Sequence, residues 1–276
     1  MALVLSGVTY RYAGTQKPVL HGIDLRVERG EVVGVAGASD AGKSTLCLVA
    51  AGLAPGTVGG TLTGSVEIDS EATTSLKPFE LAQRCGMLFQ NSVTQLSGTS
   101  RSVWEEIAFG PRNLGLPLAE VVERVEAGLA ALRIEALASR DPLRVSGGQA
   151  QLVALASVLA LRPAYLVLDE PTSQLDPEGT QLVGDALAGL AGTAGTGILI
   201  VEHKTDLLAR LTQRMLVLDA GRVALAGATD AVLEDPTLRA LGVEPPSLVT
   251  IGREAAAAGI RLDPAELAMA LAPRRA

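Results

Sequence analysis

The sequence contains few aromatic residues and few cysteines. Aromatics make up 3% of its 276 residues, so stacking platforms for single-stranded nucleic acid are not expected. The two cysteines, Cys47 and Cys85, lack metal-binding spacing and are interpreted as reduced, partly buried thiols of a cytosolic protein. A formal net charge of −7 argues against a broad phosphate-binding surface. The composition therefore predicts no nucleic-acid partner.

Long apolar runs are also missing. The uncharged stretch Ser44–Val66 is interrupted by Pro55 and five glycines, and Val145–Leu161 is too short and too polar at its start to cross a bilayer. The first twelve residues lack the basic and apolar regions of a secretory signal. We expect any role at a membrane to require a membrane partner.

The stretch Val32–Thr45 carries the strongest chemical signal. An apolar segment that suits a buried strand leads into a loop of the form G-x-x-x-x-G-K-[ST], and an apolar helix is expected over Thr45–Ala51. Backbone N–H groups of such a loop cradle an anion, Lys43 adds a charge for phosphates, and the Ser44 hydroxyl can bind Mg²⁺. The alternative is a glycine-rich turn that matches by chance. The loop residues are Gly37, Ala38, Ser39, Asp40, Ala41, Gly42, Lys43 and Ser44.

Strands are predicted on both sides of this stretch. Leu3–Tyr12 and Leu20–Val27 precede it, and Ser65–Ile68 follows a glycine- and threonine-rich loop over 56–63. Tyr12 shares a strand face with Tyr10. It could stack on a nucleotide base or be an ordinary half-buried aromatic.

The middle of the chain is predicted to be helical. A strand ends at Gln90, whose amide could reach Mg²⁺ or the attacking water, or simply cap the strand. An amphipathic helix is expected over Leu118–Leu137 and another over Ala150–Leu161. Ser146, Gly147, Gly148 and Gln149 introduce the second helix, either as an anion-binding terminus or as a mere helix cap.

Two carboxylates end an apolar strand that is predicted over Tyr165–Glu170. Buried acids must be solvated, paired or metal-bound, so Asp169 can join a Mg²⁺ shell and Glu170 can polarise a water. The chain then turns away over Pro171–Asp176. A later strand, Gly197–Val201, is followed by His203.

Taken together, GASDAGKST, the Gln90 strand end, VSGGQ, YLVLDEPT, SQLD and His203 resemble, in order, the motifs of ABC-type ATPase domains. The resemblance covers roughly residues 3–227. Four further stretches look like the ATPase subunits of energy-coupling-factor (ECF) importers for vitamins and metal ions. These are LFQNSVTQL, IAFGPRNLGLP, SQLDP and GVEPPSLV.

The resemblance implies roles for the residues that match. Tyr12 would stack on adenine, and the loop residues with Thr45 would hold the phosphates and Mg²⁺ of ATP. Gln90 would sense the γ-phosphate and couple to the membrane partner, Asp169 would hold Mg²⁺ through water, and Glu170 would be the general base. His203 would bind the γ-phosphate. Ser146–Gln149 would close over ATP held by a second subunit, and Ser173–Asp176, including Asp176, would cross the same interface.

Three positions depart from the family pattern. Asp40 replaces a glycine of the phosphate loop, Leu152 replaces an arginine, and Val145 replaces a leucine. Asp tolerates left-handed backbone, so the loop is expected to keep its fold, with the Asp40 side chain turned away from the phosphates. We favour an active site over a degenerate one that hydrolyses ATP slowly, because Lys43, Glu170 and His203 are all present.

The predicted architecture is an α/β P-loop NTPase domain of the ABC ATPase type, with an N-terminal antiparallel β portion and a helical subdomain at about 91–161. It spans residues 1–228, and a short helical C-terminal extension spans 229–276. In the extension, Ser247 is expected to cap one helix and 263–266 to begin another.

The predicted function is ATP hydrolysis that energises an ECF-type importer at the cytoplasmic face of the cell membrane. Its expected partners are a second ATPase subunit, identical or paralogous, a transmembrane scaffold and a substrate-binding membrane subunit. The alternatives are a soluble ABC ATPase acting on nucleic acid or ribosomes, and a nucleotide-gated subunit with slow hydrolysis.

Overall fold

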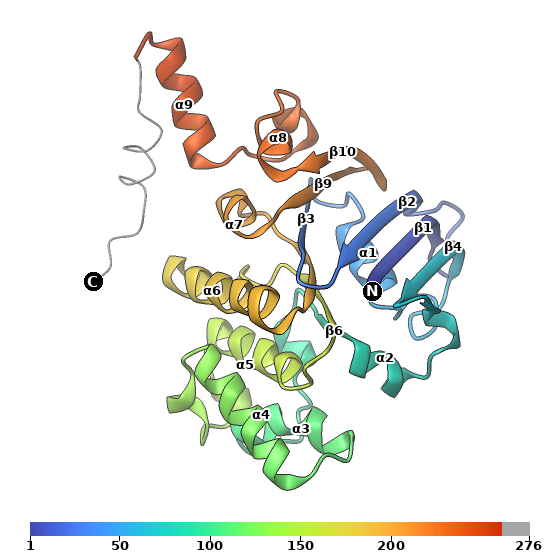
Figure 1. The fold of residues 1–276 in the computed structure, drawn as a ribbon, viewed down its shortest axis with the longest axis vertical. Coiled ribbons are helices and arrows are strands. Elements are labelled where there is room, and N and C mark those ends of the chain that lie inside the picture. The colour runs from blue at the N-terminus through green and yellow to red at the C-terminus, as the bar shows by residue number, and fades with distance from the viewer. Residues whose placement is uncertain (261–276) are drawn as a thin grey trace.

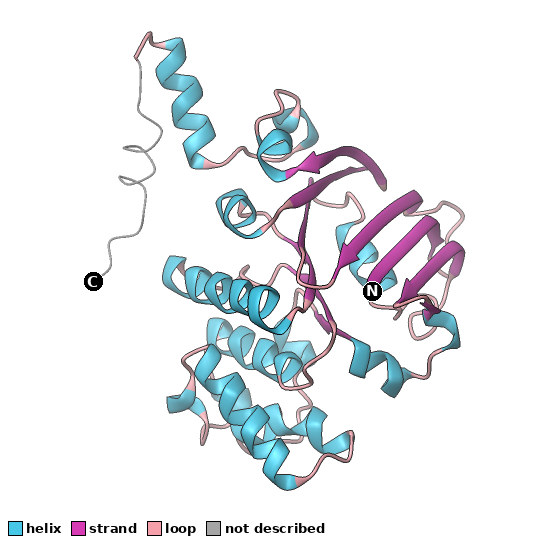
Figure 2. Cartoon of the chain, viewed as in Figure 1, coloured by secondary structure: helices cyan, strands magenta, loops and turns pink. Residues whose placement is uncertain are grey.

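The computed structural model describes residues 1–260, which form two β-sheets and a set of helices (Figures 1 and 2). One sheet is antiparallel with the strand order β2-β1-β4-β5, and the other has the order β10-β9-β3-β8-β7-β6. The antiparallel sheet contains β1 (Ala2–Arg11), β2 (Leu20–Glu28), β4 (Thr61–Ile68) and β5 (Glu71–Ala72). The second sheet contains β3 (Val32–Gly37), β6 (Cys85–Leu88), β7 (Tyr165–Asp169), β8 (Gly197–Val201), β9 (Arg214–Asp219) and β10 (Arg222–Ala228).

The central strands of the second sheet are parallel and fully buried. Strands β3 and β8 are apolar throughout, and β7 is apolar up to Asp169 at its end, as expected for strands covered on both faces. The pairs β3–β8, β7–β8 and β6–β7 are all parallel, so the carboxyl ends of these four strands lie along one edge. Residues that follow β3, β6, β7 and β8 are therefore brought together there.

Helix α1 (Lys43–Ala50) lies between the two sheets (Figure 1). Its apolar side chains Leu46, Cys47 and Val49 are completely buried in the core that the two sheets share. This burial on all sides explains why the segment after the P-loop is apolar without an amphipathic period.

The helical subdomain occupies the lower part of Figure 1 and contains α3, α4 and α5. It packs against the opposite face of the second sheet, in a core that includes Ile107, Val125 and Leu155. The bounds of the remaining helices are α2 (Pro78–Arg84), α3 (Val103–Asn113), α4 (Leu118–Ala131), α5 (Gly147–Leu159), α6 (Pro177–Ala194), α7 (Thr205–Leu211), α8 (Thr229–Leu233) and α9 (Ser247–Ala257).

Three predicted element bounds are wrong by three residues or more. Helix α4 ends at Ala131 rather than at residue 137, because Arg133 takes a left-handed conformation with φ 50° and the chain turns there. Helix α5 begins at Gly147 rather than at residue 150, because Ser146 caps it. Strand β4 begins at Thr61, inside the predicted loop, because it continues its pairing with β1 that far.

The residues that directly follow β10 belong to the hydrophobic core. Val232, Leu233, Leu238 and Val243 are buried in the same cluster as the second sheet. The boundary between residues 228 and 229 stays a prediction, and this packing favours an extension that starts later in the chain. The predicted helix at 263–266 lies outside the described residues.

The prediction that Ser247 caps a helix is wrong, because Ser247 is the first residue of α9 and its hydroxyl donates to Asp206 at 2.9 Å.

Candidate active site

The order of strands in the second sheet brings four predicted site segments to one edge. The P-loop follows β3, His203 follows β8, Glu170 follows β7, and Gln90 follows β6. Because β3, β8, β7 and β6 are neighbours in this order, segments far apart in the chain lie side by side. Ligands of open α/β sheets bind at this carboxyl edge.

The P-loop has the geometry of an anion cradle. Gly37 has φ 153° and Gly42 has φ 97°, and a Cβ at Gly37 would lie 2.4 Å from the carbonyl oxygen of Leu218. Gly42 precedes α1 without any side-chain cap, so the first N–H groups of that helix are free to meet an anion. The loop thus has the shape that its glycines predict.

Lys43 lies at the floor of this loop. Its side chain is buried and its Nζ donates to the carbonyl oxygens of Gly37 at 3.0 Å and Ala38 at 2.7 Å. Burial lowers the pKa of Lys43, and the nearby carboxylates of Glu170, Asp169 and Asp40 oppose that shift. An incoming phosphate would supply the anionic partner that this ammonium lacks.

Asp169 fits the role of a group in a Mg²⁺ shell. It is 3% exposed, and its Oδ1 has no hydrogen-bond partner among residues 1–260. Burial raises the pKa of Asp169, and contact with the Ser44 hydroxyl opposes that shift. The described residues contain no cluster of three or more His, Cys, Asp or Glu that could hold a metal. A Mg²⁺ ion here would therefore need the phosphates of a nucleotide as well as Ser44 and Asp169, as is usual for this ion.

Glu170 is held between two side chains. Its Oε2 accepts a hydrogen bond from Gln90 Nε2 at 3.0 Å, and its Oε1 lies 3.1 Å from His203 Nε2. The backbone of Glu170 is left-handed, with φ 51°, which is unusual for a residue other than glycine and is typical of functional sites. The structure thus joins all three residues that the sequence analysis named as catalytic.

Among the described residues, Gln90 forms no hydrogen bond with Asp169 or Ser44. Its part in the Mg²⁺ site therefore stays a prediction.

The phosphate-loop substitution is accommodated by the backbone. Asp40 has φ 63°, in the left-handed region that Asp tolerates better than most residues, and its side chain is exposed. The expectation that the loop keeps its fold is therefore confirmed. Its outward-pointing carboxylate stays a prediction.

Tyr12 lies beside α1. Its hydroxyl is 3.0 Å from the hydroxyl of Thr45, and its ring meets Tyr10 edge-on with centroids 5.0 Å apart. Strand β1 ends at Arg11, one residue before Tyr12, so the shared strand face of the two tyrosines stays a prediction. Stacking of Tyr12 on adenine stays a prediction.

Ser146–Gln149 form a capping box at the start of α5. Gln149 N–H donates to the Ser146 hydroxyl, and Ser146 N–H donates to the Gln149 side chain at 3.1 Å. Gly147 and Gly148 face Gln174 of the following turn rather than the P-loop of the same chain. This placement agrees with a role on nucleotide held by another subunit, which stays a prediction. Asp176 caps α6 by accepting from Gly179 N–H at 2.7 Å.

Four buried or half-buried polar residues support this site and were not named from the sequence. Gln95 bonds the backbone of Met87 and Phe89, just before Gln90, and Gln151 donates to the carbonyl of Pro171 at 3.1 Å. Glu202 and Lys204 flank His203 and both bond the turn after Glu170. In the sequence, the only sign of these four residues is that they lie near residues already named. Each of their contacts joins distant parts of the chain, so the sequence does not predict it.

Comparison with known proteins agrees with this geometry. A family model described as "ABC transporter" matches residues 20–173, which is more than half of the chain. The chain therefore belongs to the ABC transporter family, and its fold is that of the family's ATP-binding cassettes.

Two solved structures share the whole architecture. One is cbiO1 from Clostridium perfringens, described as part of the ABC transporter complex cbiONQ. It is 28% identical with a TM-score of 0.75, over 93% of this chain and 96% of that one. The other is a dimeric ATP-binding cassette in a post-hydrolysis state bound to ADP and Pi. It is 26% identical with a TM-score of 0.72, over 83% of this chain and 99% of that one.

Sequence relatives carry related names. A putative ABC transporter ATP-binding protein of Methanosarcina mazei is 42% identical over 89% of this chain, which spans only 42% of that protein's length. A putative ABC transporter ATP-binding protein of Pyrococcus horikoshii is 39% identical, over 90% of this chain and 87% of its own length. The energy-coupling factor transporter ATP-binding protein EcfA of Methanosarcina acetivorans is 37% identical, over 90% of this chain and 87% of its own length.

Proposed function

We propose that this chain hydrolyses ATP to drive a membrane importer of the energy-coupling-factor type, which takes up a vitamin or a transition-metal ion. It would act at the cytoplasmic face of the membrane as a dimer with a second, identical or paralogous ATPase subunit. The observation that carries the proposal is the Glu170 carboxylate, held by Gln90 and His203 at the sheet edge that also bears the P-loop. The names of EcfA and cbiO1 support the importer class.

The geometry accounts for the chemical step. The loop N–H groups and Lys43 hold the β- and γ-phosphates of ATP, and a Mg²⁺ ion near Ser44 and Asp169 would neutralise the charge that develops on them. Glu170 takes a proton from the attacking water. At the same time the oxygen of that water bonds to the γ-phosphorus, and the bond between the γ-phosphorus and ADP breaks. Gln90 and His203 keep the carboxylate oriented toward that water.

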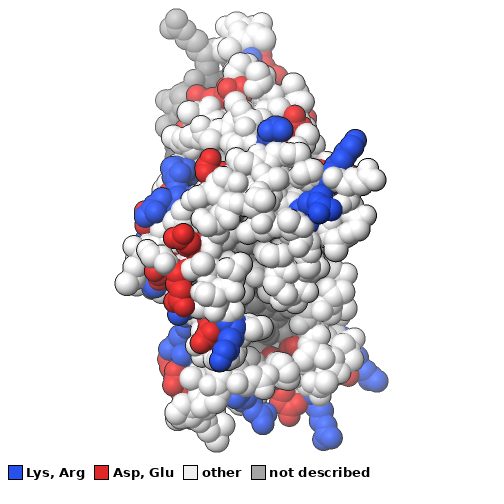
Figure 3. Space-filling model, turned by 90° about the vertical axis from the view of Figure 1, so that its right-hand side faces the viewer, with Lys and Arg blue, Asp and Glu red and all other residues white. Residues whose placement is uncertain are grey.

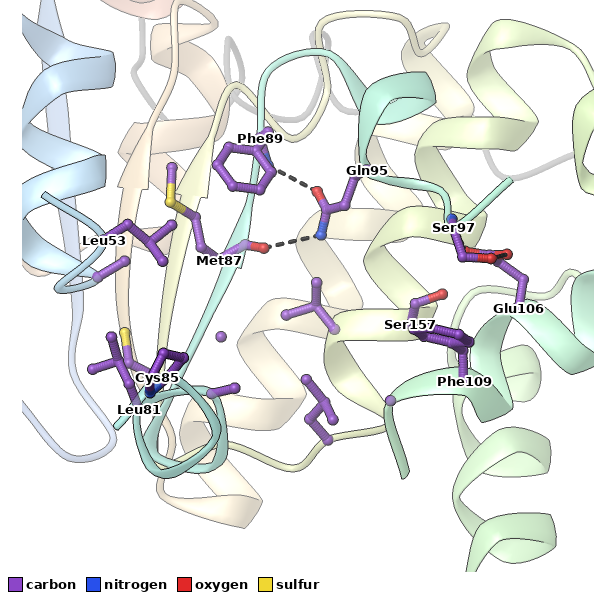
Figure 4. A pocket seen from close by; sticks show the side chains of 17 residues that line it. Leu53, Leu81, Cys85, Met87, Phe89, Gln95, Ser97, Glu106, Phe109 and Ser157 are labelled. Atoms are coloured by element: carbon purple, nitrogen blue, oxygen red, sulfur yellow. Dashed lines mark hydrogen bonds between the residues drawn. The ribbon is translucent and has the colours of Figure 1, made fainter. Parts of the chain in front are cut away.

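A groove between β6 and the helical subdomain offers a docking site for the membrane partner. It encloses about 330 Å³ (Figure 4). Met87 of β6, Leu81 of α2 and Leu53 in the loop after α1 line one side, and Glu106 and Phe109 line its side on the helical subdomain. Gln95 bridges from the subdomain to Met87 and Phe89, so the floor of the groove is tied to the segment that carries Gln90.

We propose that a short helix of the transmembrane scaffold subunit occupies this groove. The groove is largely apolar, and Phe109 at its edge is 46% exposed. No helix in the described part of the chain is long and apolar enough to cross a bilayer, so membrane coupling would need such a partner. Movement of the docked helix would reach Gln90 through Gln95.

The alternative of a nucleic-acid or ribosome-acting ATPase is not favoured by the charges. On the face that Figure 3 shows, basic side chains are mixed with acidic ones, and much of the surface carries no charge. A surface that neutralises many phosphates would instead gather lysine and arginine in one patch.

The test is co-purification of the tagged chain from detergent-solubilised membranes, followed by mass spectrometry and ATPase assay. We expect a multi-span scaffold and a small substrate-binding membrane protein, and ATP hydrolysis by the complex. Phe109→Asp should abolish capture and leave ATP affinity unchanged. The control is Leu118→Asp, which changes a 72% exposed leucine outside the groove. Capture that survives Phe109→Asp would reject the groove, and recovery of ribosomal proteins alone would reject the importer.

A further inference from the structure

Lys204 and Glu202 lie on either side of His203. Both form hydrogen bonds with the turn that follows Glu170. The Lys204 ammonium donates to the carbonyl oxygens of Thr172 at 2.8 Å and Leu175 at 3.2 Å, and to the Thr180 hydroxyl at 2.7 Å. The Lys204 ammonium therefore donates all three of its protons, two to the turn after Glu170 and one to the first helical turn of α6. Because the acceptors are uncharged, this lysine fixes geometry rather than neutralising an acid.

Glu202 holds the same turn from the buried side. It is 2% exposed, and its Oε2 accepts from the Thr172 hydroxyl at 2.6 Å. Its Oε1 accepts from the backbone N–H of His203 at 2.9 Å. The turn and the backbone of His203 are thus bonded to one buried carboxylate, which binds them together tightly.

The exposed tip of this turn reaches the start of α5. A Cβ at Gly147 would lie 2.6 Å from Gln174 Oε1, and a Cβ at Gly148 would lie 3.1 Å from the carbonyl oxygen of Gln174. The turn therefore lies directly against the start of α5, at a spacing that only glycine allows without a shift. A continuous path therefore runs from His203 through Lys204 and the turn to the glycines that introduce α5.

We propose that Lys204 is a positioning residue that couples the two ATP sites of the dimer. The inference rests on the proposed function, ATP hydrolysis by a dimer. It also takes the roles that the family resemblance implies, with His203 on the γ-phosphate of its own subunit's ATP and Ser146–Gln149 on the ATP of the partner. When His203 follows the γ-phosphate, Lys204 moves the turn with it, and the turn shifts the helix start that serves the other site. Cooperative hydrolysis is the expected result, because each site then responds to the nucleotide state of its neighbour.

The test compares Lys204→Met, which keeps the length of the side chain but removes its donors, with Lys204→Arg, which keeps donors. Steady-state hydrolysis is measured against ATP concentration with the full chain and the membrane subunits that co-purify with it. For wild type we expect a Hill coefficient above one. Lys204→Met should lower kcat about tenfold, since small misplacements of site residues have effects of this order or larger. It should bring the Hill coefficient to one, while the ATP affinity of the single subunit stays within about twofold of wild type.

Lys204→Arg and two further variants make the result specific. Lys204→Arg should restore most of the cooperativity, and Thr180→Val, which removes one acceptor, should lower it partly. Lys17→Met is the matched control, because Lys17 is exposed and lies in the loop between β1 and β2. A lysine that only stabilised the fold would lower the melting temperature and leave the Hill coefficient at its wild-type value.

The outcomes separate this inference from the proposed function. A wild-type Hill coefficient of one, or wild-type cooperativity in Lys204→Met, overturns the coupling role while hydrolysis by Glu170 stands. Full turnover in Glu170→Gln overturns the proposed catalytic function, and with it the reaction that Lys204 would serve.

Discussion

Replacing Glu170 by Gln isolates the general base from the rest of the site. The two side chains are nearly equal in size, so the left-handed backbone at φ 51° and the packing around it are retained. The amide has no basic site for the proton of the attacking water. It can still accept one hydrogen bond, from either Gln90 or His203.

The expected loss follows from the role of the group. A positioned general base contributes about 10²–10⁴-fold, which is about 2.7–5.4 kcal/mol of activation free energy at about 1.36 kcal/mol per tenfold. The hydrogen bond lost beside Gln90 costs only about 1 kcal/mol, and Gln90 is exposed and can turn to water instead. The rise in activation free energy should therefore be larger than any fall in the free energy of unfolding.

ATP affinity should remain, because the variant leaves Lys43 and the loop N–H groups unchanged. The assay combines phosphate release by the purified complex, calorimetric ATP binding, and the lifetime of the ATP-bound dimer by analytical ultracentrifugation. We expect turnover to fall at least a hundredfold and the dimer to persist longer. Glu178→Gln, at an exposed position of α6, is the control. Turnover of Glu170→Gln within twofold of wild type would refute the assignment of the base.

Three other predictions follow from single contacts. Lys43→Ala should weaken ATP binding itself, at least tenfold by calorimetry, because the only buried ammonium of the loop is removed; unchanged affinity would contradict its phosphate role. Asp40→Gly should leave ATP affinity of the isolated subunit nearly unchanged and alter dimerisation or turnover of the complex. A gain of tenfold, about 1.4 kcal/mol, would show that its carboxylate faces the phosphates. Arg214→Met should lower the free energy of unfolding by about 0.5–1 kcal/mol at pH 7 by removing the 2.7 Å ion pair with Glu31. Burial would raise the pKa of Glu31, but hydrogen bonds from the Arg214 guanidinium and the Glu28 backbone N–H, together with the charges of Arg214 and Arg26, hold that pKa below its usual 4.5. The stability from the pair is then present above pH 4.5 and lost as pH falls through the lowered pKa, so wild type and variant should converge in acid. A difference in unfolding free energy that persists below that pH would show that the arginine acts through its hydrogen bond to the Arg26 carbonyl oxygen or by packing.

Motifs whose chemistry lies in the local backbone could be predicted from the sequence. The P-loop is set by Gly37 and Gly42, which take conformations that other residues avoid, and by the lysine that follows. The left-handed Asp40 could be expected for the same reason. The strand-tip position by itself predicted that Glu170 can polarise a water. Family resemblance added its role as general base and the role of His203.

Helix α3 shows what local patterns leave open. The sequence predicts a helical subdomain at about 91–161 but assigns no separate helix over Val103–Asn113, where Gly110 and Pro111 interrupt the helical pattern. The structure keeps it helical because Val103, Ile107 and Ala108 are completely buried, and burial outweighs propensity. Gly110 is required by close approach, because a Cβ there would lie 2.7 Å from Leu161 Cδ2.

The sequence by itself determined the apolar strands, the phosphate loop and the acidic strand tip, because each depends on residues that are neighbours in the chain. Only the tertiary structure decided that Gln90 and His203 meet on the two oxygens of Glu170, and that Lys204 holds the turn after it. The order in which strands pair determines these contacts. That order results from the packing of the whole sheet, where long-range burial rather than local preference selects each neighbour.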